Sequence, residues 1–199
     1  LLLAFLKNEE NEVSKALADY NIDENIIKKE IQQENTKYID IDGDDNTKVY
    51  AYDKYICVYR KKILEFYNRA GEKSGSIELS INNPMFTTAG RYLAICEENG
   101  QKFYLITGKE KVFENEIEGN IKQINVSKNG YVSVVISNTS YKSIVDVFDG
   151  SGKEIFKTNL MSRVVDISIS QDNKYLAIAE KNGQEFCLIS DKSYLWKQT

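Results

Sequence analysis

A tyrosine-led apolar segment recurs along this chain at intervals of about 40 residues, and no other feature limits the possible folds as strongly. Its copies read YICVY at residues 55–59, YLAIC at 92–96, YVSVV at 131–135 and YLAIA at 175–179. A short turn-forming stretch precedes each copy. Self-similarity with this period is typical of propeller blades and of helical arrays. The content of a single repeat decides between the two.

The third repeat is the clearest, and it contains four short runs rich in β-branched and aromatic residues. These runs are 121–127, 131–139, 143–149 and 153–160, and stretches rich in Gly, Asn, Asp and Ser separate them. Short runs bounded by such residues are typical of strands joined by hairpins. Four strands per repeat make one propeller blade. Helical arrays would need longer segments with a 3.6-residue period, and none follows residue 36.

Two further similarities between repeats support this interpretation. The segment 97–107, with Asn99-Gly100 between two strand-like runs, parallels 180–190, which contains Asn182-Gly183. Asn-Gly between two strands is a strong hairpin signal, because both central residues of a type I′ turn need a positive φ. The exit from the third strand also recurs, since residues 67–72 resemble residues 148–153.

The sequence therefore predicts an all-β domain over residues 37–199, built from antiparallel four-stranded propeller-like blades. The repeats span 47–82, 83–120, 121–162 and 163–199. Outside the third repeat, strands are expected at 55–61, 63–68, 76–80, 91–97, 102–107, 111–116, 164–170 and 194–198. About four repeats are visible, and they could belong to a larger propeller. A series of blades that does not close into a ring leaves two long edge strands exposed, and these can pair with another chain. We expect a partner, the N-terminal helix, a second copy or residues outside this sequence to cover them.

The stretch from Ser168 to Ala177, SISQDNKYLA, resembles the S-x-D-G-K-x-L-A turn and strand of WD-repeat-like, TolB-type and quinoprotein-type propellers. Asn173 stands where those propellers most often have glycine, and the Gly-His and Trp-Asp pairs of true WD repeats are absent from the sequence. The run from Tyr131 to Ser170 also resembles a bacterial family of uncharacterised, membrane-tethered, propeller-like proteins. The resemblance implies a propeller fold and a tether, and it implies no known activity.

Residues 1–36 are predicted to form an N-terminal helical or stalk segment, because apolar residues recur there at three- and four-residue spacing. The apolar start, Leu1 to Leu6, is too short to span a bilayer, which needs about 20 residues. It is either a short helix end or the remainder of a longer hydrophobic segment. On the second interpretation, a segment upstream of Leu1 tethers the protein to the extracytoplasmic face of a cell membrane. A cytoplasmic protein is the alternative.

The composition argues against several kinds of site. The chain has no His, which removes the commonest general base and metal ligand. Its net charge of −4 argues against a general nucleic-acid surface. The three Cys residues form no C-x-x-C pair, so neither a zinc site nor a disulfide framework is expected. The acidic run 38–46 fails the calcium-loop pattern, because Ala51 stands where the final glutamate would be. We expect no metal and no cofactor.

Two sets of residues are candidates for function. A dense group of tyrosines in the first repeat could form a contact surface, since tyrosine is enriched at interfaces. This group is Tyr50, Tyr52, Tyr55, Tyr59 and Tyr67. Asp166, near the start of a predicted inner strand, is the candidate channel carboxylate.

Because the sequence contains no catalytic motif, we expect a non-catalytic module of propeller type that binds a protein or a cell-envelope component. One alternative is a glycan-active enzyme with two carboxylates roughly 5–10 Å apart in a propeller channel. Another is a structural assembly subunit, a homo-oligomer whose copies pair through open sheet edges.

Overall fold

The computed structural model describes residues 41, 43, 47–181, 183–188 and 196–198, the last two ranges as backbone only. The chain divides into two units, Leu1–Asp40 and Ile41–Thr199, and the described strands all lie in the second. The helical segment expected over residues 1–36 lies outside the described residues. Most of the acidic run 38–46 lies outside them as well.

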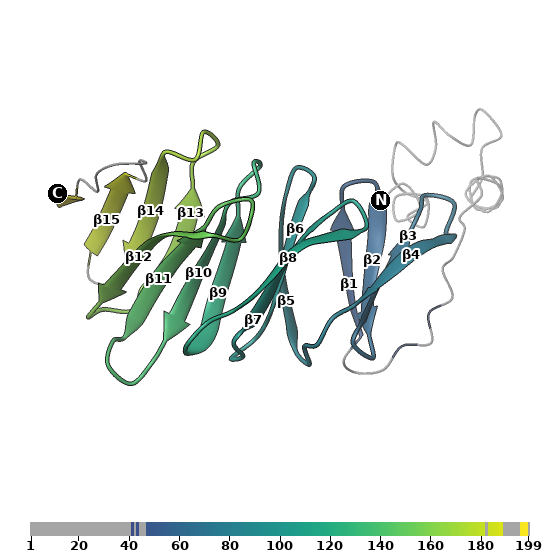
Figure 1. Ribbon diagram of the computed structural model, residues 1–199, viewed down its shortest axis with the longest axis horizontal. Coiled ribbons are helices and arrows are strands. Elements are labelled where there is room, and N and C mark those ends of the chain that lie inside the picture. The colour runs from purple at the N-terminus through teal and green to yellow at the C-terminus, as the bar shows by residue number, and fades with distance from the viewer. Residues whose placement is uncertain (1–40, 42, 44–46, 182, 189–195, 199) are drawn as a thin grey trace, which may run out of the picture. The chain divides into compact units, whose positions relative to one another are not determined.

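Every regular element in the described part of the chain is a β-strand, and the strands form four antiparallel sheets that follow one another in chain order (Figure 1). The first sheet contains β1 (Lys48–Tyr52), β2 (Tyr55–Arg60), β3 (Ile63–Tyr67) and β4 (Lys73–Glu78). The second contains β5 (Pro84–Ala89), β6 (Tyr92–Glu97), β7 (Lys102–Thr107) and β8 (Glu110–Glu116). The third contains β9 (Asn120–Val126), β10 (Val132–Ser137), β11 (Ser143–Phe148) and β12 (Glu154–Leu160). The fourth contains β13 (Val164–Ile169), β14 (Tyr175–Glu180), β15 (Gly183–Leu188) and the short β16 (Trp196–Gln198).

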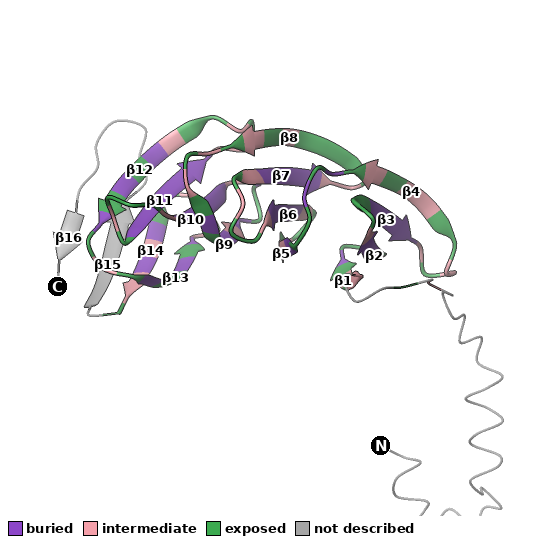
Figure 2. Ribbon diagram, turned by 90° about the horizontal axis from the view of Figure 1, so that it is seen from below, coloured by how far each residue is buried: buried purple, intermediate pink, exposed green. Residues whose placement is uncertain are grey.

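Each sheet is a meander in which strands adjacent in the chain are also hydrogen-bonded neighbours. The predicted all-β, blade-like architecture is therefore confirmed as three complete four-stranded blades and a fourth that ends in a three-residue strand. The structure adds two first strands that the sequence did not indicate, β1 and β5. Within this unit, the first strands β1, β5, β9 and β13 lie on the inner side of the arc of sheets, and β4, β8 and β12 lie on the outer side (Figure 2).

The turn that leads into the tyrosine segment has the same hydrogen bonds in the third and fourth blades. The backbone nitrogens of Ser127 and Ser170 donate to the carbonyls of the repeat tyrosines, Tyr131 and Tyr175, at 2.8 and 2.9 Å. Each serine Oγ also accepts from the tyrosine nitrogen, at 3.1 and 3.0 Å. The resemblance between the repeats therefore reflects a shared turn as well as a shared strand.

The turn after the third strand is also shared. The Oδ1 atom of Asn68 accepts from the backbone nitrogens of residues 70 and 72 at 2.9 and 3.0 Å. The Oδ1 atom of Asp149 accepts from those of residues 151 and 153 at 2.8 and 3.1 Å. Gly71 and Gly152 follow at φ values of 75° and 87°, a region that glycine enters without steric cost. This loop geometry turns the chain from the third strand into the fourth.

Side-chain alternation along the second strand of each blade sets the packing between blades. The repeat tyrosine and the residues two and four positions later face the next blade, as Cys57 and Tyr59 do in the cluster shared by the first and second blades. The residues one and three positions later face the preceding blade, as Leu93 and Ile95 do in the same cluster. The other two clusters, between the second and third blades and between the third and fourth, follow this rule. The core is thus a series of apolar layers between sheets.

Candidate functional site

Three of the five candidate contact tyrosines are core residues. Tyr52, Tyr59 and Tyr67 are 1%, 2% and 8% exposed, and the first two belong to the layer between the first and second blades. The Tyr52 hydroxyl donates to the Arg91 carbonyl at 2.6 Å, and the Tyr59 hydroxyl donates to the Ile81 carbonyl at 2.6 Å. Burial raises the pKa of both phenols to about 12. Alternation turns Tyr52 and Tyr59 towards the second blade, whereas Tyr67 lies on the other face of the first sheet, where its hydroxyl donates to Glu65 at 3.1 Å.

Tyr50 and Tyr55 are half-buried and border separate clefts. The Tyr50 ring stacks on Phe86 with 3.7 Å between centroids, and the two rings line a cleft of about 430 Å³ beside the inner strands. Tyr55 packs edge-on against Phe66 and lines a different cleft of about 660 Å³. The structure therefore does not bring the five tyrosines together on one surface.

Asp166 is exposed on β13, an innermost strand, as the sequence indicated. Its Oδ1 atom accepts from Gln123 Nε2 on β9 at 2.9 Å and from the backbone nitrogen of Ile167 at 2.9 Å. The first of these bonds joins the inner strands of the third and fourth blades. The contact that Asp166 makes is thus a link between blades.

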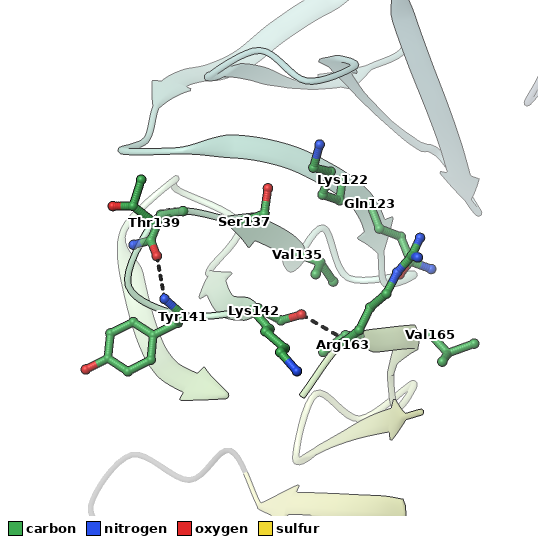
Figure 3. A pocket seen from close by; sticks show the side chains of 12 residues that line it. Lys122, Gln123, Val135, Ser137, Thr139, Tyr141, Lys142, Arg163 and Val165 are labelled. Atoms are coloured by element: carbon green, nitrogen blue, oxygen red, sulfur yellow. Dashed lines mark hydrogen bonds between the residues drawn. The ribbon is translucent and has the colours of Figure 1, made fainter. Parts of the chain in front are cut away.

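The largest of the three described clefts, about 810 Å³, lies beside this link (Figure 3). Its walls come from β9, from the end of β10 with the loop 138–142, and from the start of β13. The volume is within the range of roughly 300–1,000 Å³ that ligand pockets usually have. Segments that are far apart in the sequence meet here only because the third and fourth blades pack side by side.

The charged residues that line this cleft are all cations: Lys122 from β9, Lys142 from the loop and Arg163 before β13. The Lys122 amine donates to Asn99 Oδ1. Neither Lys142 nor Arg163 has a carboxylate partner within the described part of the chain. A chain with a net charge of −4 therefore has a locally positive, partly apolar hollow, to which Val135, Tyr141 and Val165 add the apolar surface. Such a lining favours an anionic ligand.

No sequence pattern indicates this cleft. Lys122, Lys142 and Arg163 lie in three different segments, and no spacing rule links them. The only available signal was indirect: residues 140–142 were expected to join two strands of the third blade, and Arg163 to precede the first strand of the fourth. Neither expectation placed the residues at the same end of adjacent blades.

Two carboxylates are buried among the described residues, and both are ion-paired. Glu65 is 6% exposed and accepts from Lys73 Nζ at 2.6 Å, Arg60 Nε at 3.0 Å and the Tyr67 hydroxyl at 3.1 Å. Asp146 is 1% exposed and accepts from Lys157 Nζ at 3.1 Å through Oδ2. Both lie inside or against sheets, away from the lining of the three described clefts.

The described thiols are also internal. Cys57 and Cys96 are free and fully buried, and burial raises the pKa of each thiol to about 12. Among the described residues, no group of three or more Cys, Asp or Glu side chains could hold a metal ion. None of the described segments is a helix with the length and hydrophobicity that a membrane crossing requires.

The sequence matches a known protein family. A model for a family of unknown function, DUF5711, matches residues 26–185. The chain belongs to this family. The match spans three full repeats and most of the fourth, and so includes the cleft between the third and fourth blades. Among curated proteins, none matches the sequence.

Solved structures similar to this family member include WD40-type propellers. They include Hsv2 from Kluyveromyces lactis, with a TM-score of 0.56 and 12% identity over 76% of this chain and 52% of that one. The WD40 domain of coronin from Toxoplasma gondii gives a TM-score of 0.51 and 9% identity over 75% of this chain and 44% of that one. A functionally unknown protein from Desulfotomaculum acetoxidans gives a TM-score of 0.56 and 13% identity over 74% of this chain and 51% of that one. At these identities the likeness shows the fold alone. The chain spans about half the length of the solved structures it matches.

Proposed function

We propose that this propeller-type domain is a non-catalytic binding module that holds an acidic segment of a partner protein in the cleft between the third and fourth blades. The observation that supports the proposal is the lining of that cleft, which contains three cations and no carboxylate. Apolar side chains in the same lining suit a peptide with apolar residues next to its acidic ones. Loops held at the ends of rigid blades are a common place for recognition.

Two cations make the cleft distinctive. Lys142 and Arg163 are exposed and have no described carboxylate partner, so an anionic ligand would not have to displace an existing ion pair. The guanidinium of Arg163 can bind a carboxylate through two parallel hydrogen bonds, and the Lys142 amine adds a second positive charge. The Asp166–Gln123 bond holds the two walls together. The site is thus pre-organised for an anion.

The enzyme alternative has less support. Glycan hydrolysis needs two carboxylates on either side of a bound sugar. The cleft offers none, and the two buried carboxylates of the described residues are ion-paired within sheets. The geometry therefore favours binding over catalysis.

The proposal can be tested by fluorescence anisotropy with a labelled glutamate–tyrosine copolymer peptide. We expect Lys142→Glu and Arg163→Glu each to weaken binding by at least about tenfold, and added salt to weaken the wild type. Lys128→Glu is the matched control, because Lys128 is exposed in the turn at the opposite end of the third blade. Equal effects of all three substitutions would contradict a local site. Binding of a glycerol-phosphate polymer in place of the peptide would point to a cell-envelope ligand instead.

We further propose that a segment upstream of Leu1 tethers this module to a membrane on the extracytoplasmic side. The support is the apolar start of the sequence, Leu1 to Leu6, followed by a polar stretch. Fractionation of the full-length protein tests this: it should sediment with membranes and be released by detergent but not by salt. Release by salt alone would contradict a hydrophobic tether.

A further inference from the structure

The cleft beside Tyr55, between the first and second blades, is lined by charges of one sign. Its volume is about 660 Å³, and its charged lining residues are Lys54, Arg69 and Lys109. Within the described part of the chain, none of the three has a carboxylate partner. They come from the turn between β1 and β2, the loop between β3 and β4, and the turn between β7 and β8. Two blades therefore bring three cations to one hollow.

This cleft lies at the opposite ends of the blades from the cleft that Lys142 and Arg163 line. In a four-stranded meander, the connections after the first and third strands share one end of the sheet, and the connection after the second strand lies at the other. Lys54 and Lys109 lie in connections of the first kind, whereas Lys142 follows the second strand β10. The two cationic clefts are therefore separate sites.

Lys109 reaches from the second blade to the first. Its Nζ atom donates to the Ser74 carbonyl at 2.8 Å. Its stem passes over Gly75 on β4, where a Cβ atom would lie only 3.0 Å from Lys109 Cδ. Glycine inside a strand often marks a close approach of this kind. Because an ammonium group has three N–H donors, the bond to Ser74 leaves two for a ligand.

A hydroxyl and an aromatic ring complete the lining. Ser74 lines the cleft, and its Oγ atom is buried without a hydrogen-bond partner among the described residues. Since buried polar atoms are nearly always bonded, a ligand oxygen at this wall would supply the missing acceptor. Tyr55 is half-buried and packs edge-on against Phe66, with Lys54 Nζ 5.5 Å from its ring centroid. Together with Ala70 it adds apolar surface.

We propose that this cleft binds a small phosphate monoester, with the phosphate among the three cations and the organic part packed against Tyr55. A phosphate monoester carries a charge of about −1.5 to −2 at pH 7, whereas a carboxylate carries one charge, so three cations favour the phosphate. The guanidinium of Arg69 can bind two phosphate oxygens through parallel hydrogen bonds. The Ser74 hydroxyl can donate to a third.

Isothermal titration calorimetry with phenyl phosphate tests the ligand class. Benzoate is the singly charged control, and inorganic phosphate is the control that lacks an organic part. We expect phenyl phosphate to bind at least about tenfold more tightly than either, because only this probe has both the charge and the ring. Equal binding of benzoate would overturn the assignment of a phosphate. Equal binding of inorganic phosphate would indicate an adventitious ion only, and no binding of phenyl phosphate at millimolar concentration would also overturn the proposal.

Substitutions locate the site. Arg69→Gln and Lys109→Gln each remove one charge and should weaken phenyl phosphate binding by at least about fivefold. Gly75→Ala retains every charge but displaces the stem of Lys109, so it should weaken binding by about two- to threefold. Lys142→Gln is the matched control, because Lys142 is an exposed cation of the other cleft.

Circular dichroism checks that each variant retains its sheets. The control should bind phenyl phosphate as the wild type does. An equal loss in Lys142→Gln, or full affinity in both Arg69→Gln and Lys109→Gln, would overturn the assignment of the ligand to this cleft. Full affinity in Gly75→Ala would contradict the positioning of Lys109 by the glycine.

Discussion

Glu65 and Asp146 occupy equivalent positions in the first and third blades, yet the pKa values of their carboxyl groups shift in opposite directions. Burial alone would raise the pKa of Glu65, but hydrogen bonds from Lys73, Arg60 and Tyr67 bring it below its usual value. Burial raises the pKa of Asp146, and Lys157 only partly opposes this. Asp146 Oδ1 has no partner among the described residues. Three donors outweigh the effect of burial at Glu65, and the single donor at the more deeply buried Asp146 does not.

Replacing Glu65 with Gln should lower stability by roughly 1–3 kcal/mol at neutral pH, the usual effect of losing hydrogen bonds to a charged group. The folded-state pKa of Glu65 is depressed, so its stabilising effect is complete above the unfolded value of about 4.3 and is lost as the pH falls through the folded value. Urea unfolding at several pH values measures this. An E65Q variant that loses stability in acid as steeply as the wild type would contradict the prediction.

Replacing Asp146 with Asn should change the pH dependence in the opposite sense. Its folded-state pKa is raised, so its contribution is most favourable below the unfolded value of about 3.9 and declines as the pH rises through the folded value. We expect D146N to remove this decline, which is seen as a smaller loss of stability between acid and neutral pH. The same urea titration applies, with E65Q as the comparison. If both variants altered the profile in the same direction, the donor count would not be the cause.

Replacing Asp149 with Ala should destabilise the third blade by about 1 kcal/mol, because the turn loses a side-chain oxygen that accepts two backbone bonds. Asp149→Asn is the matched control, since Asn68 makes the same two bonds in the first blade. Thermal unfolding should show a lower Tm for D149A and a near-normal one for D149N. An equal drop for both would mean that charge, not acceptor geometry, supports the turn.

Replacing Tyr59 with Phe should lower the free energy of unfolding by about 1 kcal/mol, because the buried Ile81 carbonyl loses its donor. Tyr55→Phe should have little effect, as Tyr55 is only half-buried and contributes its ring to the packing against Phe66. The difference in free energy of unfolding between Y59F and Y55F measures how far the tyrosine group belongs to the core. Equal values would argue against a core role specific to Tyr59.

The strand prediction was accurate where the signal was local. Residues 102–107 were predicted as a strand, and β7 has those bounds. The first strands β1 and β5 were missed, and β5 begins at Pro84, a residue usually confined to strand starts and edges. For the tyrosine group, density along the chain says nothing about which side of the first blade is covered.

The sequence by itself determined the blade pattern, because two-residue alternation and turn-forming residues act over a few positions of the chain. Only the tertiary structure decided which side of each strand is buried and which segments meet. Tyr59 faces the second blade, and Lys142 and Arg163 meet beside Asp166, because neighbouring blades pack face to face. Contacts between residues far apart in the chain depend on how sheets stack, and no short sequence pattern records that stacking.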